Sequence, residues 1–154
     1  MAVGFERALP PAPPGTIEMV EARLETKLPN AYKEFLRRQN GGYLEPNFFS
    51  EAVGVDYLFS AGPNDDEYID DLESIAELFS SEGEADDVLR PGFLVIGEDG
   101  TGNRLCLKVS GEDYGAVYFW DHEVADSPEA YTRLTQSFSE FFEALRPEEE
   151  LDLN

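Results

Sequence analysis

Three apolar runs lie close together in residues 93–120, whose sequence is FLVIGEDGTGNRLCLKVSGEDYGAVYFW. The runs are 93–96, 105–109 and 116–120, and the two segments between them are rich in glycine, aspartate and asparagine. In the middle run Leu105, Leu107 and Val109 alternate with other residues, which is the period of a β-strand. Glycine-rich connections of this length join antiparallel neighbours. We therefore predict an antiparallel meander over 93–120.

A pair of helices is predicted before the meander. Thr16 is a candidate N-cap, and helical spacing of apolar residues follows it until Pro29 interrupts the pattern. A second helix starts at Pro29, and Gly41 or Gly42 is expected to end it, after Asn40, in the left-handed conformation. The apolar faces of the two helices consist of Ile17, Val20, Leu24 and Leu28, and of Tyr32, Phe35 and Leu36.

Two further elements are predicted between this helical pair and the meander. Residues 53–59 alternate between apolar and smaller or polar side chains, which favours a strand. Residues 69–79 follow a turn at Gly62-Pro63-Asn64 and have a narrow apolar stripe on an otherwise acidic helix. The stripe consists of Ile69, Leu72, Ala76 and Phe79.

A C-terminal helix is predicted after the meander. Ser137 and Glu140 form a capping-box pattern, and apolar residues continue at helical spacing to Leu145, shortly before Pro147. Upstream of this helix, Ser127-Pro128-Glu129 predicts a helical turn. The chain ends are expected to contribute less: 1–15 is a proline-rich, non-helical lead-in, and 147–154 is an acidic, frayed tail.

The order of these elements predicts an α+β fold. An antiparallel sheet meander packs with the N-terminal helical pair and the C-terminal helix. The chain has 154 residues, of which 42% are hydrophobic, so one core is the economical arrangement. We expect a single domain over 1–154, because neither a repeat nor a long linker divides it.

The net charge narrows the range of partners. The chain has 11 lysines and arginines against 33 aspartates and glutamates, a formal charge of −22. Proteins that bind nucleic acid or anionic membranes draw affinity from basic residues, and this surface would repel both. We therefore expect a cationic protein partner, and neither nucleic acid nor a membrane. The sequence does not indicate an oligomeric state.

The cysteine count and the N-terminus bear on localisation. Cys106 is the single cysteine, which excludes an internal disulfide and a cysteine-cluster zinc site. Residues 1–15 do not contain the apolar core of a signal peptide, and the chain has no apolar run long enough to span a bilayer. A soluble protein of the reducing cytoplasm is expected.

Two features could carry chemistry, and each has a structural alternative. The loop 97–103 resembles a phosphate cradle or a calcium loop, but it lacks the lysine of the first and the required glycine of the second. His122, the only histidine, lies between Asp121 and Glu123 and could act as a base for a serine or for Cys106. Hydrogen bonding at a strand end is the simpler role for His122. We expect no cofactor, no metal site and no catalytic residue.

The strongest anomaly is the distribution of acidic residues. Residues 39–89 contain 14 acids and no lysine or arginine, and 11 of these acids lie within 65–87. In contrast, the chain up to Arg38 has six basic and five acidic residues. This acidic run is either a docking surface for a cationic partner or a face that only keeps the protein soluble, and the sequence leaves both open.

Three groups of residues together resemble the SUKH superfamily, also known as the Smi/Knr type. The first group contains Leu28-Pro29 and Asn40-Gly41-Gly42. The second joins the Gly102-Asn103 turn to Val117-Tyr118-Phe119-Trp120-Asp121, and the third is Ser137-Phe138 with Glu140-Phe141-Phe142. The superfamily includes bacterial toxin-immunity proteins and a fungal cell-wall regulator. The acidic run matches no motif of the superfamily.

The resemblance implies a non-catalytic binding module, in bacteria an immunity protein that neutralises a toxin by direct contact. The acidic surface leads us to expect a basic toxin domain, for instance a nuclease whose phosphate site the carboxylates would occupy. The alternative is an intracellular regulatory or scaffold domain that binds an endogenous protein. The expected partner-binding residues are the aromatics near strand ends and the acids beside them: Tyr57, Asp65, Asp66, Tyr68, Asp70, Asp71, Trp120 and Asp121.

Overall fold

The computed structural model describes residues 4–45, 47–62, 64–65, 69, 71–72, 92–124 and 127–147. The predicted α+β class is confirmed: a seven-stranded antiparallel sheet has the strand order β1-β2-β5-β6-β7-β8-β9. Its strands are β1 (Gly4–Ala8), β2 (Gly42–Glu45), β5 (Tyr57–Leu58), β6 (Phe93–Glu98), β7 (Arg104–Lys108), β8 (Val117–Trp120) and β9 (Tyr131–Thr135). A separate hairpin consists of β3 (Phe48–Ser50) and β4 (Val53–Gly54).

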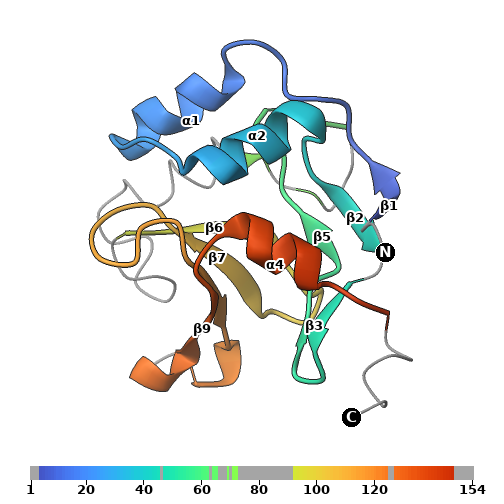
Figure 1. Cartoon of the computed structure of the whole chain (residues 1–154), viewed down its shortest axis with the longest axis vertical. Coiled ribbons are helices and arrows are strands. Elements are labelled where there is room, and N and C mark those ends of the chain that lie inside the picture. The colour runs from blue at the N-terminus through green and yellow to red at the C-terminus, as the bar shows by residue number, and fades with distance from the viewer. Residues whose placement is uncertain are drawn as a thin grey trace.

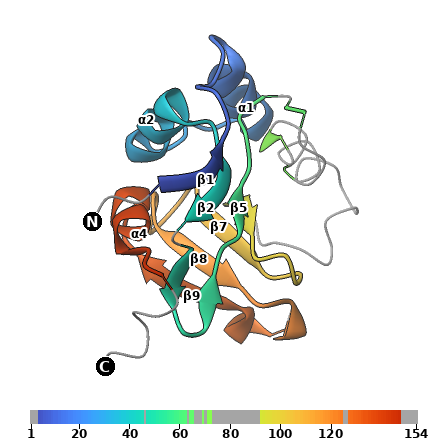
Figure 2. The same ribbon diagram turned by 90° about the vertical axis from the view of Figure 1, so that its right-hand side faces the viewer.

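Three of the four predicted helices are present; the fourth, over 69–79, lies mostly outside the described residues. They are α1 (Thr16–Leu24), α2 (Asn30–Arg38) and α4 (Phe138–Ala144), with short 3-10 turns at His122–Val124 and Pro128–Ala130. In Figure 1, α1 and α2 lie side by side at one end of the molecule and α4 crosses in front of the strands. Figure 2 shows α4 on one side of the sheet. The predicted meander 93–120 corresponds to β6, β7 and β8.

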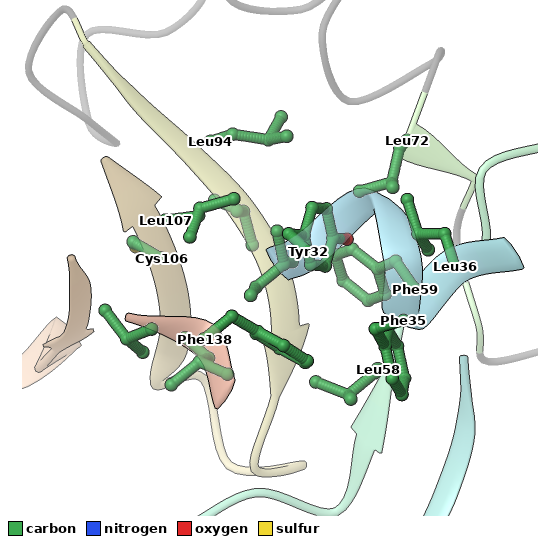
Figure 3. Close-up of a cluster of buried hydrophobic side chains, with 14 of the residues drawn as sticks. Tyr32, Phe35, Leu36, Leu58, Phe59, Leu72, Leu94, Cys106, Leu107 and Phe138 are labelled. Carbon is green, nitrogen blue, oxygen red and sulfur yellow. The ribbon is translucent and has the colours of Figure 1, made fainter. Parts of the chain in front are cut away.

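The core lies between the sheet and the helices. Tyr32 and Phe35 of α2 contact Phe138 of α4, with ring centroids 5.0 and 4.8 Å apart. Strand residues meet this aromatic group from the sheet, as Figure 3 shows for Leu58, Leu94 and Leu107. All three leucines are essentially inaccessible to solvent. Burying a leucine side chain contributes about 2 kcal/mol, so this layer holds the helices on the sheet.

The N-cap predicted for α1 is wrong by one residue, and the predicted end of the helix is several residues too late. Gly15, with φ 90°, is the N-cap, while the Thr16 hydroxyl donates to the Pro13 carbonyl. The helix stops at Leu24 because Glu25 takes the left-handed conformation with φ 57°. Leu28 is therefore outside the helix, although it is buried as its apolar character predicted.

The glycines after α2 do not end the helix. Helix α2 already stops at Arg38, and Gln39 is extended. Gly41 has φ 92°, and a Cβ on it would lie 2.6 Å from the carbonyl oxygens of Leu58 and Phe59. Asn40 fixes the same junction, since its side-chain oxygen accepts from the Ala61 amide at 2.6 Å. This motif therefore joins β2 to β5.

Three other predictions need correction. The lead-in 1–15 contains β1, which pairs with β2. The strand predicted over 53–59 is divided between β4 and β5, in different sheets. Strand β9 was not predicted at all, although the turn before it is present and the Ser127 side chain accepts from the Glu129 amide.

Two predicted segments cannot be compared fully. The helix over 69–79 lies outside the described residues except for Ile69, Asp71 and Leu72, and both apolar ones are buried. The tail beyond Pro147 also lies outside them. Within the described ranges no helix is both long enough and apolar enough to cross a bilayer.

Candidate protein-binding surface

One row of directly paired residues crosses six strands of the sheet. Each residue pairs with the next on the neighbouring strand, so all six side chains lie on the same face. We call this set the cross-strand row: Tyr43, Tyr57, Glu98, Arg104, Trp120 and Tyr131. Four of the six are tyrosine or tryptophan, the residue types enriched at protein interfaces.

The face that carries the row is the one turned away from the helices. Alternation along β7 places Arg104, Cys106 and Lys108 on the row's face, and Leu105 and Leu107 on the other. The leucine face is buried in the core, whereas Arg104 and Lys108 remain partly accessible. Arg133 of β9, opposite Tyr118, is 42% exposed on the row's face. Charged side chains of this kind would not be placed under a helix without partners.

Aromatic rings contact one another across this face. Tyr43 and Tyr57 of the row have centroids 5.6 Å apart. Phe93 meets Tyr118 at 5.0 Å and Tyr131 at 4.6 Å, although these residues belong to β6, β8 and β9. These contacts fix the tyrosine rings while leaving them half-buried. A partner that covered them would immobilise few additional side chains, which reduces the entropic cost of binding.

Trp120 lies on β8, next to the edge strand β9, and is 5% exposed. The guanidinium carbon of Arg104 is 5.3 Å from the centroid of its ring, a cation–π contact. The indole Nε1–H is buried and has no acceptor among the described residues. Buried donors of this type almost always have a partner, so this one requires an explanation.

Carboxylates lie at the strand ends along one side of the row. We call Asp56, Asp99, Asp121 and Glu123 the acidic rim; the first three are the chain neighbours of Tyr57, Glu98 and Trp120. Burial raises the pKa of the Asp56 carboxyl, and the negative charge of Asp99 raises it further. The hydrogen bond that the Asn47 side-chain amide donates to Asp56, at 3.2 Å, lowers the pKa and partly offsets this. Two negative charges are therefore close together at this edge.

The loop 97–103 is a self-contained turn. The Asp99 carboxylate accepts four hydrogen bonds, from the backbone amides and the side chains of Thr101 and Asn103. Asn103 in turn accepts from the His122 amide, and its oxygen lies 2.6 Å from His122 Nδ1. The carboxylate is thus occupied within the loop, and His122 has the strand-end hydrogen-bonding role. In the described ranges no three potential metal-ligating side chains come together.

The candidate nucleophile and base are not assembled into a catalytic pair. Cys106 is fully buried in the middle of β7, and burial raises the pKa of its thiol to about 12, against a smaller opposite effect of Arg104. His122 is exposed beyond the end of β8 and bonds to Asn103. A thiol of this kind is protonated at neutral pH and is a poor nucleophile.

The structure brings together three of the residues predicted to bind a partner. Tyr57 and Trp120 belong to the row, and Asp121 belongs to the rim. Asp65 is exposed and Asp71 is half-buried. Asp71 forms an isolated parallel β-bridge with Ser60, which lies beyond the carboxyl end of β5 and away from the rim. Asp66, Tyr68 and Asp70 lie outside the described residues.

Four other members of the cross-strand row were not predicted: Tyr43, Glu98, Arg104 and Tyr131. The register of the strands places these residues on one face of the sheet. A single sequence does not reveal the register between strands that are far apart in the chain. One signal was available. The sequence Tyr131-Thr-Arg-Leu-Thr is rich in aromatic and β-branched residues, which indicates a strand.

The sequence model of the SMI1 / KNR4 family (SUKH-1) matches residues 11–144. The chain belongs to this family. Its membership confirms the suspected resemblance, and the structure gives the SUKH-1 motifs a structural meaning. Asn40-Gly41-Gly42 joins β2 to β5, and Gly102-Asn103 closes the β6–β7 hairpin against His122.

A curated relative supports the same assignment. The SPbeta prophage-derived uncharacterized protein YokK of Bacillus subtilis (strain 168) is 26% identical over 137 residues. The alignment covers 81% of this chain and 70% of the relative. This SUKH-1 chain therefore shares most of its length with a protein of prophage origin.

Proposed function

We propose that this SUKH-1 protein is an immunity-type binding module that neutralises a bacterial toxin by direct contact. Family membership carries the proposal, since bacterial proteins of this superfamily include toxin-immunity proteins. The prophage origin named for the Bacillus subtilis relative agrees with a role in competition between genetic elements. The buried Cys106 and the hydrogen-bonded His122 support action without catalysis. We place the protein in the cytoplasm, where such a toxin would act.

The target is proposed to be a basic toxin domain, such as a nuclease. A protein with a formal charge of −22 attracts a cationic domain, and complementary fields accelerate association. Carboxylates would then occupy the sites where the toxin binds phosphate. The proposed contacts are the residues predicted above: Tyr57, Trp120 and Asp121 at the sheet, and Asp65, Asp66, Tyr68, Asp70 and Asp71 in the acidic run.

Co-expression tests the proposal. If a toxin domain is encoded beside this gene, it is induced in cells that contain either this protein or an empty vector, and growth is followed. We expect rescue by this protein, and a complex of the two purified proteins on size-exclusion chromatography. An unrelated toxin domain serves as the control and should kill both strains equally.

The opposite outcome is equally clear. Growth arrest in both strains, together with no complex between the purified proteins, would rule out immunity against that toxin. An isolated gene with no toxin domain beside it would favour the alternative, a regulatory or scaffold domain that binds an endogenous protein.

A further inference from the structure

We infer that the cross-strand row and the acidic rim together form the docking surface for a basic, arginine-bearing segment of the protein partner. This inference rests on the proposed function, because it assigns the partner's chemistry to one face of the same binding module. It places the primary contact on the sheet, and not on the acidic run between β5 and β6.

The dimensions of the row suit an extended segment. Neighbouring strands are about 4.8 Å apart, so six strands span about 24 Å from Tyr43 to Tyr131. An extended chain rises about 3.3 Å per residue, and about seven residues would cover that distance. The three tyrosines of the row are half-buried, which leaves part of each available to a partner.

The charges on this surface favour a cationic occupant. Four rim carboxylates and Glu98 outnumber the basic residues of the row's face, Arg104, Lys108 and Arg133, and Arg133 is already paired with Asp113 at 3.5 Å. Asp56 and Asp99 repel each other at this edge. Burial is the main reason why the pKa of Asp56 is raised, and the negative charge of Asp99 raises it further. A cation from a partner would relieve that repulsion. The Arg104 contact with Trp120 shows within this chain that the aromatic surface accepts a guanidinium.

Trp120 provides an independent observation. Its Nε1–H is buried on this face, and no described residue accepts from it. A peptide segment laid along the row brings backbone carbonyl groups, which are the acceptors that this donor lacks. The indole Nε1–H of Trp120 and the acidic rim therefore favour the same occupant, a polypeptide with basic side chains.

The chain contains a single tryptophan, so Trp120 reports on this face directly. The probe is heptaarginine, whose length matches the row. We titrate it into 15N-labelled protein and follow the indole Nε1–H resonance and the tryptophan fluorescence. We expect the indole resonance to shift in a saturable manner, with an affinity that falls as the salt concentration rises.

Two variants with equal charge changes separate the rim from the general negative field. The rim variant is Asp56→Asn, Asp121→Asn and Glu123→Gln, in which the amide oxygens can keep the hydrogen bonds that Asp56 and Asp121 accept. The control variant is Glu18→Gln, Glu25→Gln and Glu34→Gln, three exposed positions in and just after the helices. We expect the rim variant to weaken binding about tenfold, and the control variant by less than about twofold.

Equal weakening by the two triple variants, or saturation of the peptide without any change at Trp120, would overturn the inference. A third variant, Asp65, Asp66, Asp70 and Asp71→Lys, identifies the acidic run as the site if it alone abolishes binding. This test does not depend on the toxin. If the peptide binds at Trp120 but the protein rescues no cells, only the proposed function is refuted. If the protein rescues cells but the peptide binds elsewhere, only the inference is refuted.

Discussion

Gly41 occupies a position that no other residue can fill without strain. Its φ of 92° is left-handed, and the carbonyl oxygens of Leu58 and Phe59 lie 2.6 Å from where a Cβ would be. Gly111 has a similar φ of 79° but open space around it. A substitution at Gly111 therefore tests backbone strain alone, and one at Gly41 tests backbone strain together with steric overlap.

We predict that Gly41→Ala lowers the free energy of unfolding by more than about 3 kcal/mol, because the added methyl group forces β2 away from β5. Gly111→Ala should cost only about 1 kcal/mol, the strain of the left-handed conformation alone. Urea unfolding of both variants measures the difference. Equal losses would show that the close approach at Gly41 relaxes freely.

Glu21 is a buried carboxylate, 7% exposed, that ties α1 to the turn before α2. It accepts from the Leu28 amide at 2.8 Å and forms an ion pair with Lys33 at 3.1 Å. Burial acts to raise its pKa, but the Leu28 amide, Lys33 and the more distant Lys27 outweigh it and hold the pKa below the usual value of 4.5. The ionised form is therefore the one that stabilises the fold.

We predict that Glu21→Gln lowers the free energy of unfolding by about 1–3 kcal/mol near neutral pH, since the ion pair with Lys33 is lost. Glu25→Gln, which makes the same charge change at an exposed site, should have an effect within about 0.5 kcal/mol. Because the folded-state pKa is lowered, the contribution of Glu21 is complete above 4.5 and disappears as the pH falls through the folded-state value. Urea midpoints over a pH series should thus show the two variants converging in acid; a constant gap would contradict this assignment.

At the level of elements, α4 depends on its N-cap. The Ser137 hydroxyl accepts from the Glu140 amide at 3.2 Å, and the helix has only seven residues, Phe138–Ala144. We predict that Ser137→Ala lowers the free energy of unfolding by about 1 kcal/mol. Ser139→Ala, exposed on the same helix, should be nearly neutral and is the matched control. Thermal unfolding of both provides the measurement, and indistinguishable melting temperatures would exclude a capping role.

Helices and strands that have a clear local sequence pattern could be predicted. Strands that form only because a neighbouring strand pairs with them could not. In the meander 93–120 and in the C-terminal helix, the apolar periodicity and the residues that end each element lie within a few positions of one another. In contrast, β1 is recruited by β2, and its sequence before a proline-rich stretch has no local strand pattern. Strand β5 retains two residues because β4 pairs with β3 in a second sheet. Tertiary pairing overrides local propensity in both cases.

For the whole molecule, the distribution of charge predicts association kinetics. Reversing Asp65, Asp66, Asp70 and Asp71 to lysine should slow association with the toxin domain and flatten its salt dependence, because exposed charges act over roughly 8 Å at physiological ionic strength. Dissociation should change less, since short-range contacts determine it. Stopped-flow association rates at two salt concentrations measure the effect. An unchanged rate at low salt would leave these acids with a solubilising role only.

The binding surface could be predicted only in part. Tyr57 and Trp120 were identified individually, because aromatic residues near strand ends are frequent interface anchors. Their position on one face follows from three successive pairings, Tyr57 with Glu98, Glu98 with Arg104, and Arg104 with Trp120. The first of these joins residues that are far apart in the chain. A single sequence contains the composition of such a surface but not the register that assembles it.

Strands β5 and β6 are antiparallel neighbours, and yet residues 59–92 separate them in the chain. The scaffold therefore contains a hairpin whose connection has been greatly lengthened. Lengthening a connection is inexpensive, about 0.6 kcal/mol for each doubling, and in this chain Ile69 and Leu72 anchor part of it in the core. Provided that these two anchors are kept, substitutions or changes of length in the rest of the connection should cost the sheet little stability. The fold thus tolerates variation in this connection that it would not tolerate in a short turn.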